Sequence, residues 1–157
     1  MKGVNLKLSY QKNCKMEHIA ILNKKLRLLE KIISGNKTIE SRWYKFKRTP
    51  YKNIQGGEIV YFKESGEKVT VSAVVEKVLF FSDLNEDKIK KILREYGREI
   101  GVENSHVKNL IGKKYCTLMF LKDVKEINPF NINKKGYGLM SAWISVDDIN
   151  KLKIKPS

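Results

Sequence analysis

The stretch Ile32-Ile33-Ser34-Gly35-Asn36-Lys37-Thr38-Ile39-Glu40-Ser41-Arg42 decides the interpretation of this chain, because it contains the pattern G-x-K-x-x-E-x-R. Before it, apolar side chains recur at helical spacing, and Asn23 is a suitable N-cap. Gly35 stands where a helix C-terminal glycine belongs. We therefore predict a helix that ends at Gly35 and an extended segment over residues 37–42.

The extended segment is a candidate binding site. Alternate side chains of a strand share a face, so Glu40 and Arg42 are expected to project together, with Ile39 pointing toward the core. Lys37 lies at the bend after the helix and could reach the same cleft. A carboxylate between two cations would stay ionised, and the arginine would be held ready for phosphate or a base edge. The alternative is an ordinary helix stop followed by a surface ion pair worth under about 1 kcal/mol.

The remaining pattern predicts the fold class. Alternation of apolar residues indicates strands, helical periodicity indicates a second long helix, and Gly56-Gly57 marks a turn. This order of elements predicts an α+β fold, a small β-barrel or mixed sheet with two flanking helices. The further elements are strands over residues 17–22, 58–63, 68–81, 115–124 and 139–146, a helix over 83–101, and a short helix or turn over 105–112.

Together these residues resemble the ASCH domain family, a branch of the PUA-like superfold. The resemblance rests on the first strand, the helix end, the G-x-K-x-x-E-x-R string and the strands after Gly56-Gly57, and it covers roughly residues 16–126. It implies a PUA-like β-barrel whose cleft is lined by Lys37, Glu40 and Arg42 and is usually linked to RNA or nucleotide recognition. We expect one domain over residues 16–157, preceded by an N-terminal extension over residues 1–15.

The segment after the motif has the composition of a single-stranded nucleic-acid site. Residues 42–52 hold five cations, four aromatics and no acid. Cations neutralise phosphates, and aromatic faces stack on unpaired bases. The alternative is that the aromatics pack under a loop while the lysines are merely solvated. The candidate nucleic-acid-binding residues are Lys37, Glu40, Arg42, Trp43, Tyr44, Lys45, Lys47, Arg48 and Lys52, with Trp43 or Tyr44 as the stacking residue.

A second hypothesis is a hydrolase acting on RNA or on a modified nucleoside such as acetylcytidine. One branch of the family consists of amidohydrolases that use a Lys, a Thr three residues later and a downstream Glu. This chain keeps Lys37, but Glu40 stands at the threonine position and cannot be the same nucleophile. Catalytic roles for Lys37 and Glu40 would apply only if the protein is an enzyme. The downstream glutamate could be any of Glu95, Glu99 and Glu103, and a protein-binding adaptor is a third possibility.

The amino-acid composition limits the classes of protein to which this chain can belong. The chain has 157 residues with 32 Lys+Arg against 17 Asp+Glu, and 41% of them are apolar, enough for a core. Residues 1–57 hold 14 basic and 3 acidic residues, so most of the excess charge of +15 lies there. Two distant cysteines and two histidines are too few for a structural zinc site. We expect a cytoplasmic, monomeric protein without membrane span or cofactor that binds RNA, such as tRNA, or a nucleotide.

Overall fold

The computed structural model describes residues 15–102 and 106–156. The predicted N-terminal extension over residues 1–15 therefore lies, apart from Lys15, outside the described residues, as does Glu103. The helices and strands follow the predicted order closely. In chain order they are β1 (Glu17–Leu22), the 3-10 turn η1 (Lys24–Leu26), α2 (Leu28–Ser34), β2 (Ile39–Tyr44), β3 (Ile59–Glu64), β4 (Val69–Phe81), α3 (Glu86–Ile100), α4 (Val107–Leu110), β5 (Tyr115–Ile132), β6 (Trp143–Val146), η3 (Ile149–Lys151) and β7 (Lys153–Ile154).

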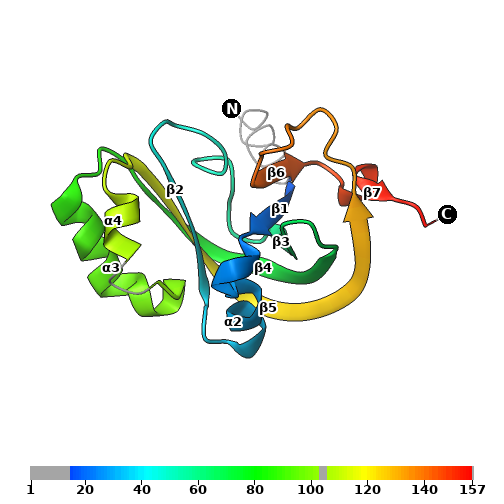
Figure 1. Cartoon of the computed structure of the whole chain (residues 1–157), viewed down its shortest axis with the longest axis horizontal. Helices are drawn as coiled ribbons and strands as arrows, with labels where there is room; N and C mark the ends of the chain where they lie inside the picture. Colours follow the sequence, from blue (N-terminus) through cyan, green and yellow to red (C-terminus); the bar gives the residue numbers. More distant parts are fainter. Residues whose placement is uncertain (1–14, 103–105, 157) are drawn as a thin grey trace, which may run out of the picture.

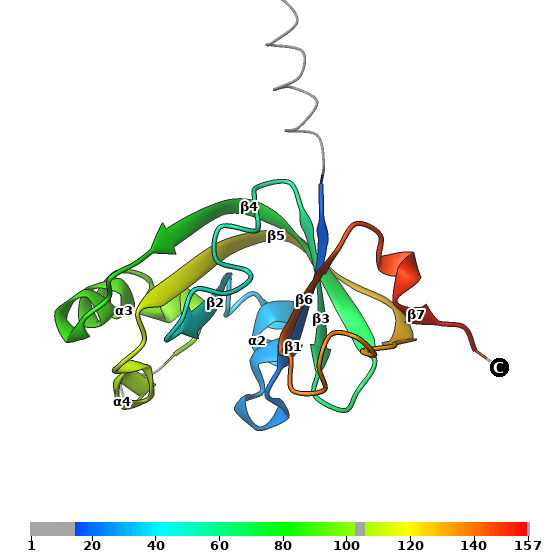
Figure 2. The ribbon, with the colours of Figure 1, turned by 90° about the horizontal axis from the view of Figure 1, so that it is seen from above.

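The strands form one mixed sheet in the order β2-β5-β4-β3-β1-β6, with β7 paired to the end of β5. β1 and β3 run parallel and the other neighbours are antiparallel. The two long strands, β4 and β5, curl strongly and give the sheet the form of a half-barrel (Figures 1 and 2). The predicted α+β class with a barrel-like mixed sheet is confirmed. In this order β2 and β6 are the two edges, and the curl turns them toward each other.

Three apolar clusters hold this sheet together. The first fills the inside of the curl around Phe62, Val71 and Met119, and α2 contributes Leu29 and Ile32 to it. The second lies between α3 and the β2–β5–β4 end of the sheet. The third joins β1, β6 and the C-terminal segment. Ile39 and Trp43 of β2 belong to the second cluster, so the alternate residues Glu40 and Arg42 project from the other side of this strand.

The predicted first helix is interrupted. Asn23 accepts a hydrogen bond from Lys25 N and caps η1, but Arg27 adopts a left-handed conformation with φ 54°, so α2 begins only at Leu28. Gly35 closes α2 with φ 83°, as predicted.

Three further differences concern the C-terminal part of the chain. β5 extends eight residues beyond the predicted residue 124, the strand predicted over residues 139–146 begins only at Trp143, and β7 was not predicted. None of the helices in the described ranges is long and apolar enough to cross a bilayer.

Candidate nucleic-acid interface

Lys37 joins the motif to the end of a helix sixty residues away. Its Nζ donates to the carbonyl oxygens of Ile39 and Ile100, both at 2.6 Å, and lies 3.8 Å from Glu40 Oε1. Thr38 N donates to Glu99 O at 2.9 Å, so two of the last carbonyls of α3 are bound by this segment. Free carbonyls at a helix C-terminus need such partners, and a cation there also complements the helix dipole. The motif lysine therefore docks α3 against β2.

This placement corrects the expectation that Lys37 reaches the cleft as a nucleic-acid-binding residue. The side chain is 2% exposed, and its three N–H groups face two carbonyls and a carboxylate. Burial lowers the pKa of the Lys37 ammonium, and the nearby Glu40 carboxylate offsets this only in part. The hydrolase hypothesis, in which Lys37 would activate a nucleophile, stays a prediction.

Glu40 is buried on β2, and only one of its two carboxylate oxygens accepts a hydrogen bond within the described residues. Oε1 accepts from its neighbour's backbone, Ser41 N, at 2.8 Å. Oε2 lies 3.9 Å from the Arg42 guanidinium, too far for a hydrogen bond, and no donor within the described part of the chain reaches it. A buried carboxylate oxygen is a strong acceptor, and leaving it unpaired is costly. Glu40 is thus a pre-positioned acceptor for an N–H group.

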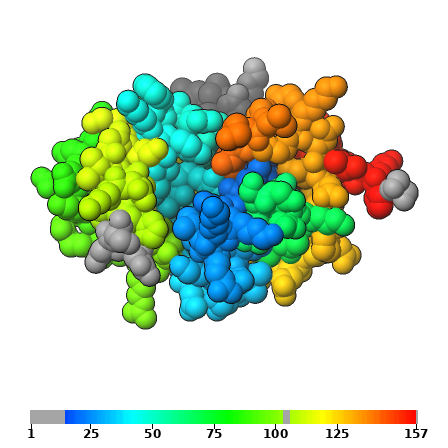
Figure 3. All heavy atoms as spheres, in the orientation of Figure 1, coloured from blue at the N-terminus to red at the C-terminus, as the bar shows by residue number. Residues whose placement is uncertain are grey.

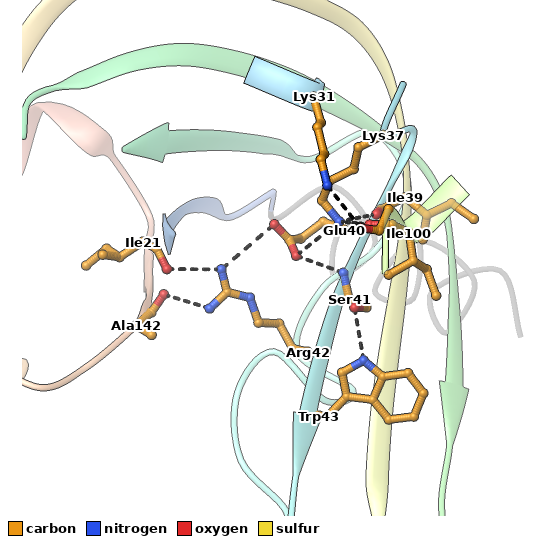
Figure 4. A network of polar contacts seen from close by, with 11 residues as sticks. Ile21, Lys31, Lys37, Ile39, Glu40, Ser41, Arg42, Trp43, Ile100 and Ala142 are labelled. Atoms are coloured by element: carbon orange, nitrogen blue, oxygen red, sulfur yellow. Dashed lines mark hydrogen bonds and ion pairs between the residues drawn. The ribbon is translucent and has the colours of Figure 1, made fainter. Parts of the chain in front are cut away.

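Arg42 bridges the two edges of the half-barrel. From β2 its guanidinium donates to Ala142 O, just before β6, at 3.1 Å and to Ile21 O of β1 at 3.3 Å (Figure 4). The guanidinium also lies 5.2 Å from the ring centroid of Trp143. Nε is buried and has no acceptor among the described residues. The predicted common face of Glu40 and Arg42 is therefore present, and Arg42 additionally closes part of the seam between the edges.

A cleft of about 400 Å³ follows this seam. Residues 40–44 of β2 form one wall, and residues 21–23 together with Ala142 form the other. Leu110 and Lys113 extend the wall on the β2 side. The volume is at the low end of the range for small-ligand pockets, about 300–1,000 Å³. We call this space the seam cleft.

The two aromatic residues after Arg42 lie on opposite faces of β2. Trp43 is half-buried, packs against the α3 cluster and donates from Nε1 to Ser41 Oγ at 3.0 Å (Figure 4). Trp43 is among the residues that line the seam cleft, but its side chain lies on the face opposite Glu40 and Arg42, because side chains alternate along a strand. Tyr44 shares the face of Arg42, and the Arg48 guanidinium lies 5.0 Å from its ring centroid. Of the two predicted stacking residues, the placement favours Tyr44.

The predicted basic segment continues from β2 as an exposed loop. Lys45, Lys47, Arg48 and Lys52 are all exposed, and none pairs with a carboxylate among the described residues. Each instead lies within 6 Å of the centroid of an aromatic ring in the same segment. The four cations therefore lie close to the aromatics of residues 44–51, and none of them forms an ion pair within the part of the chain that the structure describes.

One aromatic residue of this loop is packed beneath it, and another is exposed where it could stack on a base. Tyr51 is buried beneath the loop, against Phe80 and Tyr115. Phe46, which is not among the predicted site residues, is 72% exposed and is available for stacking. Lys113, at the cleft wall, is likewise not among the predicted site residues. Of the three downstream glutamates, Glu95 borders a separate hollow between β4 and α3, Glu99 is an exposed residue of α3, and Glu103 is not described.

A second buried polar group lies at the other edge of the sheet. His18 is completely buried and its Nε2 is 2.8 Å from Glu58 Oε1, while its Nδ1 is 2.8 Å from Ser145 Oγ. Glu58 also accepts from Met16 N and Gln55 N. The group ties β1, β6 and the start of β3 together, and burial lowers the pKa of His18 despite the adjacent carboxylate. We interpret His18 as a structural residue.

Comparison with known proteins identifies the fold. No family model matches the sequence, and no curated protein matches it. The structure is similar to the crystal structure of ASCH from Zymomonas mobilis, at 19% identity and a TM-score of 0.61, over 82% of this chain and 85% of that one. Two single-residue variants of the Zymomonas mobilis protein, Tyr-to-Phe and Ser-to-Ala, align with TM-scores of 0.64 at 19% and 18% identity. These alignments cover 86% of this chain and 94% and 92% of those chains. The chain therefore has the ASCH fold.

Proposed function

We propose that this protein is an RNA-binding module that recognises RNA through the seam cleft and the exposed basic loop of residues 45–52. The observation that carries the proposal is the pair of unpaired groups beside the cleft, the acceptor Glu40 Oε2 and the donor Arg42 Nε. Buried polar atoms normally find partners, so a site that leaves one acceptor and one donor unpaired is suited to a ligand that supplies both.

A nucleobase supplies this complement. The edge of an adenine or a cytosine places an amino donor beside a ring-nitrogen acceptor, and such edges are accessible when the base is unpaired. Glu40 would accept from the exocyclic amine, and Arg42 would donate to the ring nitrogen. Tyr44 on the same face offers an aromatic surface for stacking. Because Arg42 is fixed by two carbonyls across the seam, its guanidinium is held in place before the ligand arrives.

The exposed loop supplies the phosphate contacts. Lys45, Lys47 and Arg48 follow directly on β2, so a strand of RNA leaving the cleft along this loop would pass over three unneutralised cations. Phe46 lies between them and could stack on a second base. Affinity from such contacts is electrostatic and decreases with salt, with a slope of about −0.7 in log K against log salt for each phosphate neutralised on a single strand.

Fluorescence anisotropy with a labelled single-stranded RNA, measured over a KCl series, tests the proposal. The triple variant K45Q/K47Q/R48Q should weaken binding and reduce the salt slope by about 2. The matched control K68Q/K125Q/K155Q removes the same charge from the β3–β4 turn, β5 and the C-terminal tail, and should retain most of the slope. Absence of binding by the wild type at low salt would refute RNA binding. Equal losses in the two variants would refute this location of the site.

A further inference from the structure

The loop between β5 and β6 presents two large apolar side chains to solvent. Leu139 is 87% exposed and Met140 is 95% exposed. The loop is nevertheless braced from within, because Lys134 Nζ donates to Leu139 O at 2.8 Å and to Ser141 O at 2.9 Å. We call Leu139 and Met140 the apolar tip. Two adjacent apolar side chains held out by an ordered loop indicate a surface that another molecule covers.

The apolar tip stands at the rim of the seam cleft. Ala142, two residues after Met140, lines the cleft and accepts the hydrogen bond from Arg42. Leu139, Met140 and Ala142 line a neighbouring hollow of about 390 Å³ together with residues 21–23, which also form a wall of the cleft. In the space-filling view the segment of β6 and the loop before it (orange) lies beside the blue segment that contains β1 (Figure 3). The tip therefore borders a hollow that shares residues 21–23 and Ala142 with the seam cleft.

We propose that the apolar tip is a wedge that enters the base stack of a structured RNA while one nucleotide is displaced into the seam cleft. This inference rests on the proposed function and specifies its substrate class as stacked or paired RNA, beyond a preformed single strand. Proteins that open a stack insert apolar side chains such as Leu and Met between base steps, and a displaced base is then read on its exposed edge. The cleft offers that reading edge through Glu40 and Arg42.

Continuity with the cleft favours RNA over a lipid surface as the molecule that covers the tip. The tip consists of only two side chains, a small apolar area for a membrane contact, and its hollow shares residues 21–23 and Ala142 with the seam cleft. Lys135, exposed in the same loop, could contact the RNA backbone next to the opened step. A wedge needs a receiving pocket within reach for the displaced base, and the seam cleft is that pocket.

The test uses an RNA hairpin with 2-aminopurine at one stem position, whose fluorescence rises when the base leaves the stack. Wild-type protein at saturation should raise this fluorescence for at least one stem position. The variant L139S/M140S should bind a single-stranded RNA with unchanged affinity but should lose the fluorescence rise and bind the hairpin more weakly. The matched control I154S changes an apolar residue on β7 that is 50% exposed and should behave as wild type.

Each other outcome overturns the inference in a recognisable way. RNA binding without a fluorescence rise at any stem position, or a rise that persists in L139S/M140S, would refute the wedge and leave the proposed function intact. If L139S/M140S weakens binding to the single-stranded RNA as much as binding to the hairpin, the tip is a general RNA contact and the wedge is refuted. Wild-type co-sedimentation with phosphatidylglycerol vesicles that this variant loses would assign the tip to a lipid surface. Absence of any RNA binding would remove the proposed function and the wedge together.

Discussion

Replacing Lys37 with methionine should destabilise the fold, because this side chain is buried and holds α3 against β2. The change keeps an unbranched apolar stem but leaves the carbonyls of Ile39 and Ile100 without their donor and Glu40 without its nearest ammonium. Hydrogen bonds to a charged group contribute about 1.5–3 kcal/mol each. Since the buried ammonium itself is costly to desolvate, we expect a net loss of about 3–4 kcal/mol in the free energy of unfolding.

Urea unfolding followed by circular dichroism measures this loss, and the melting temperature should fall by roughly 6–16 °C, at about 2–4 °C per kcal/mol for a domain of this size. Lys31→Met is the matched control. Lys31 Nζ is 3.5 Å from Gly101 O and the side chain is only half-buried, so its loss should cost less than about 1 kcal/mol. Adding Glu40→Gln to Lys37→Met should recover part of the loss, because it removes an uncompensated buried charge. A loss for Lys37→Met no larger than that for Lys31→Met would refute the docking role.

Three further predictions concern other parts of the molecule. Burial lowers the pKa of His18 below its ordinary 6.5, so below that pH the native state binds fewer protons than the unfolded state, and stability falls as the pH drops from about 6.5 toward the lowered value. In urea unfolding at several pH values, the free energy of unfolding of the wild type should fall by up to about 1.4 kcal/mol per pH unit in this window, and that of His18→Gln should not. An equal pH dependence in the two proteins would contradict the lowered pKa of His18. Burial raises the pKa of the Cys116 thiol, so in a Cys14→Ser protein a disulfide reagent should modify it only after denaturation, and rapid labelling of the native protein would contradict its burial. Gly35→Ala should cost about 1 kcal/mol through its left-handed backbone alone, since nothing lies within 4 Å of an added Cβ; an unchanged urea midpoint would contradict that conformation.

Local patterns were sufficient to predict most of the fold. Alternation marked β1, β3 and β4, and the helical stripe of α3 lies where the apolar spacing places it. Gly35 ends α2 because a left-handed residue is needed there. The break at Arg27 could not be predicted, because nothing in that residue type favours a positive φ. The second half of β5 was missed because its alternation is weak and only its pairing with β4 and β7 extends it.

The candidate site was predicted in outline but not in its roles. Strand parity correctly placed Glu40 and Arg42 on one face, and the same parity places the Trp43 side chain on the opposite face. The role of Lys37 depends on the carbonyl of Ile100, which reaches it only through the tertiary fold. Likewise, Arg42 finds its acceptors at Ile21 and Ala142 only because the sheet curls its two edges together.

The location of RNA binding is the central claim, and a titration of the nitrogen-15-labelled protein with a short single-stranded RNA, followed by amide chemical shifts, tests it most directly. We expect the largest shifts at residues 40–48, at Lys113 and around Ala142, with little change in β7 and the β3–β4 turn. Shifts spread evenly over the lysine-rich surface, or concentrated away from the seam cleft, would contradict the account.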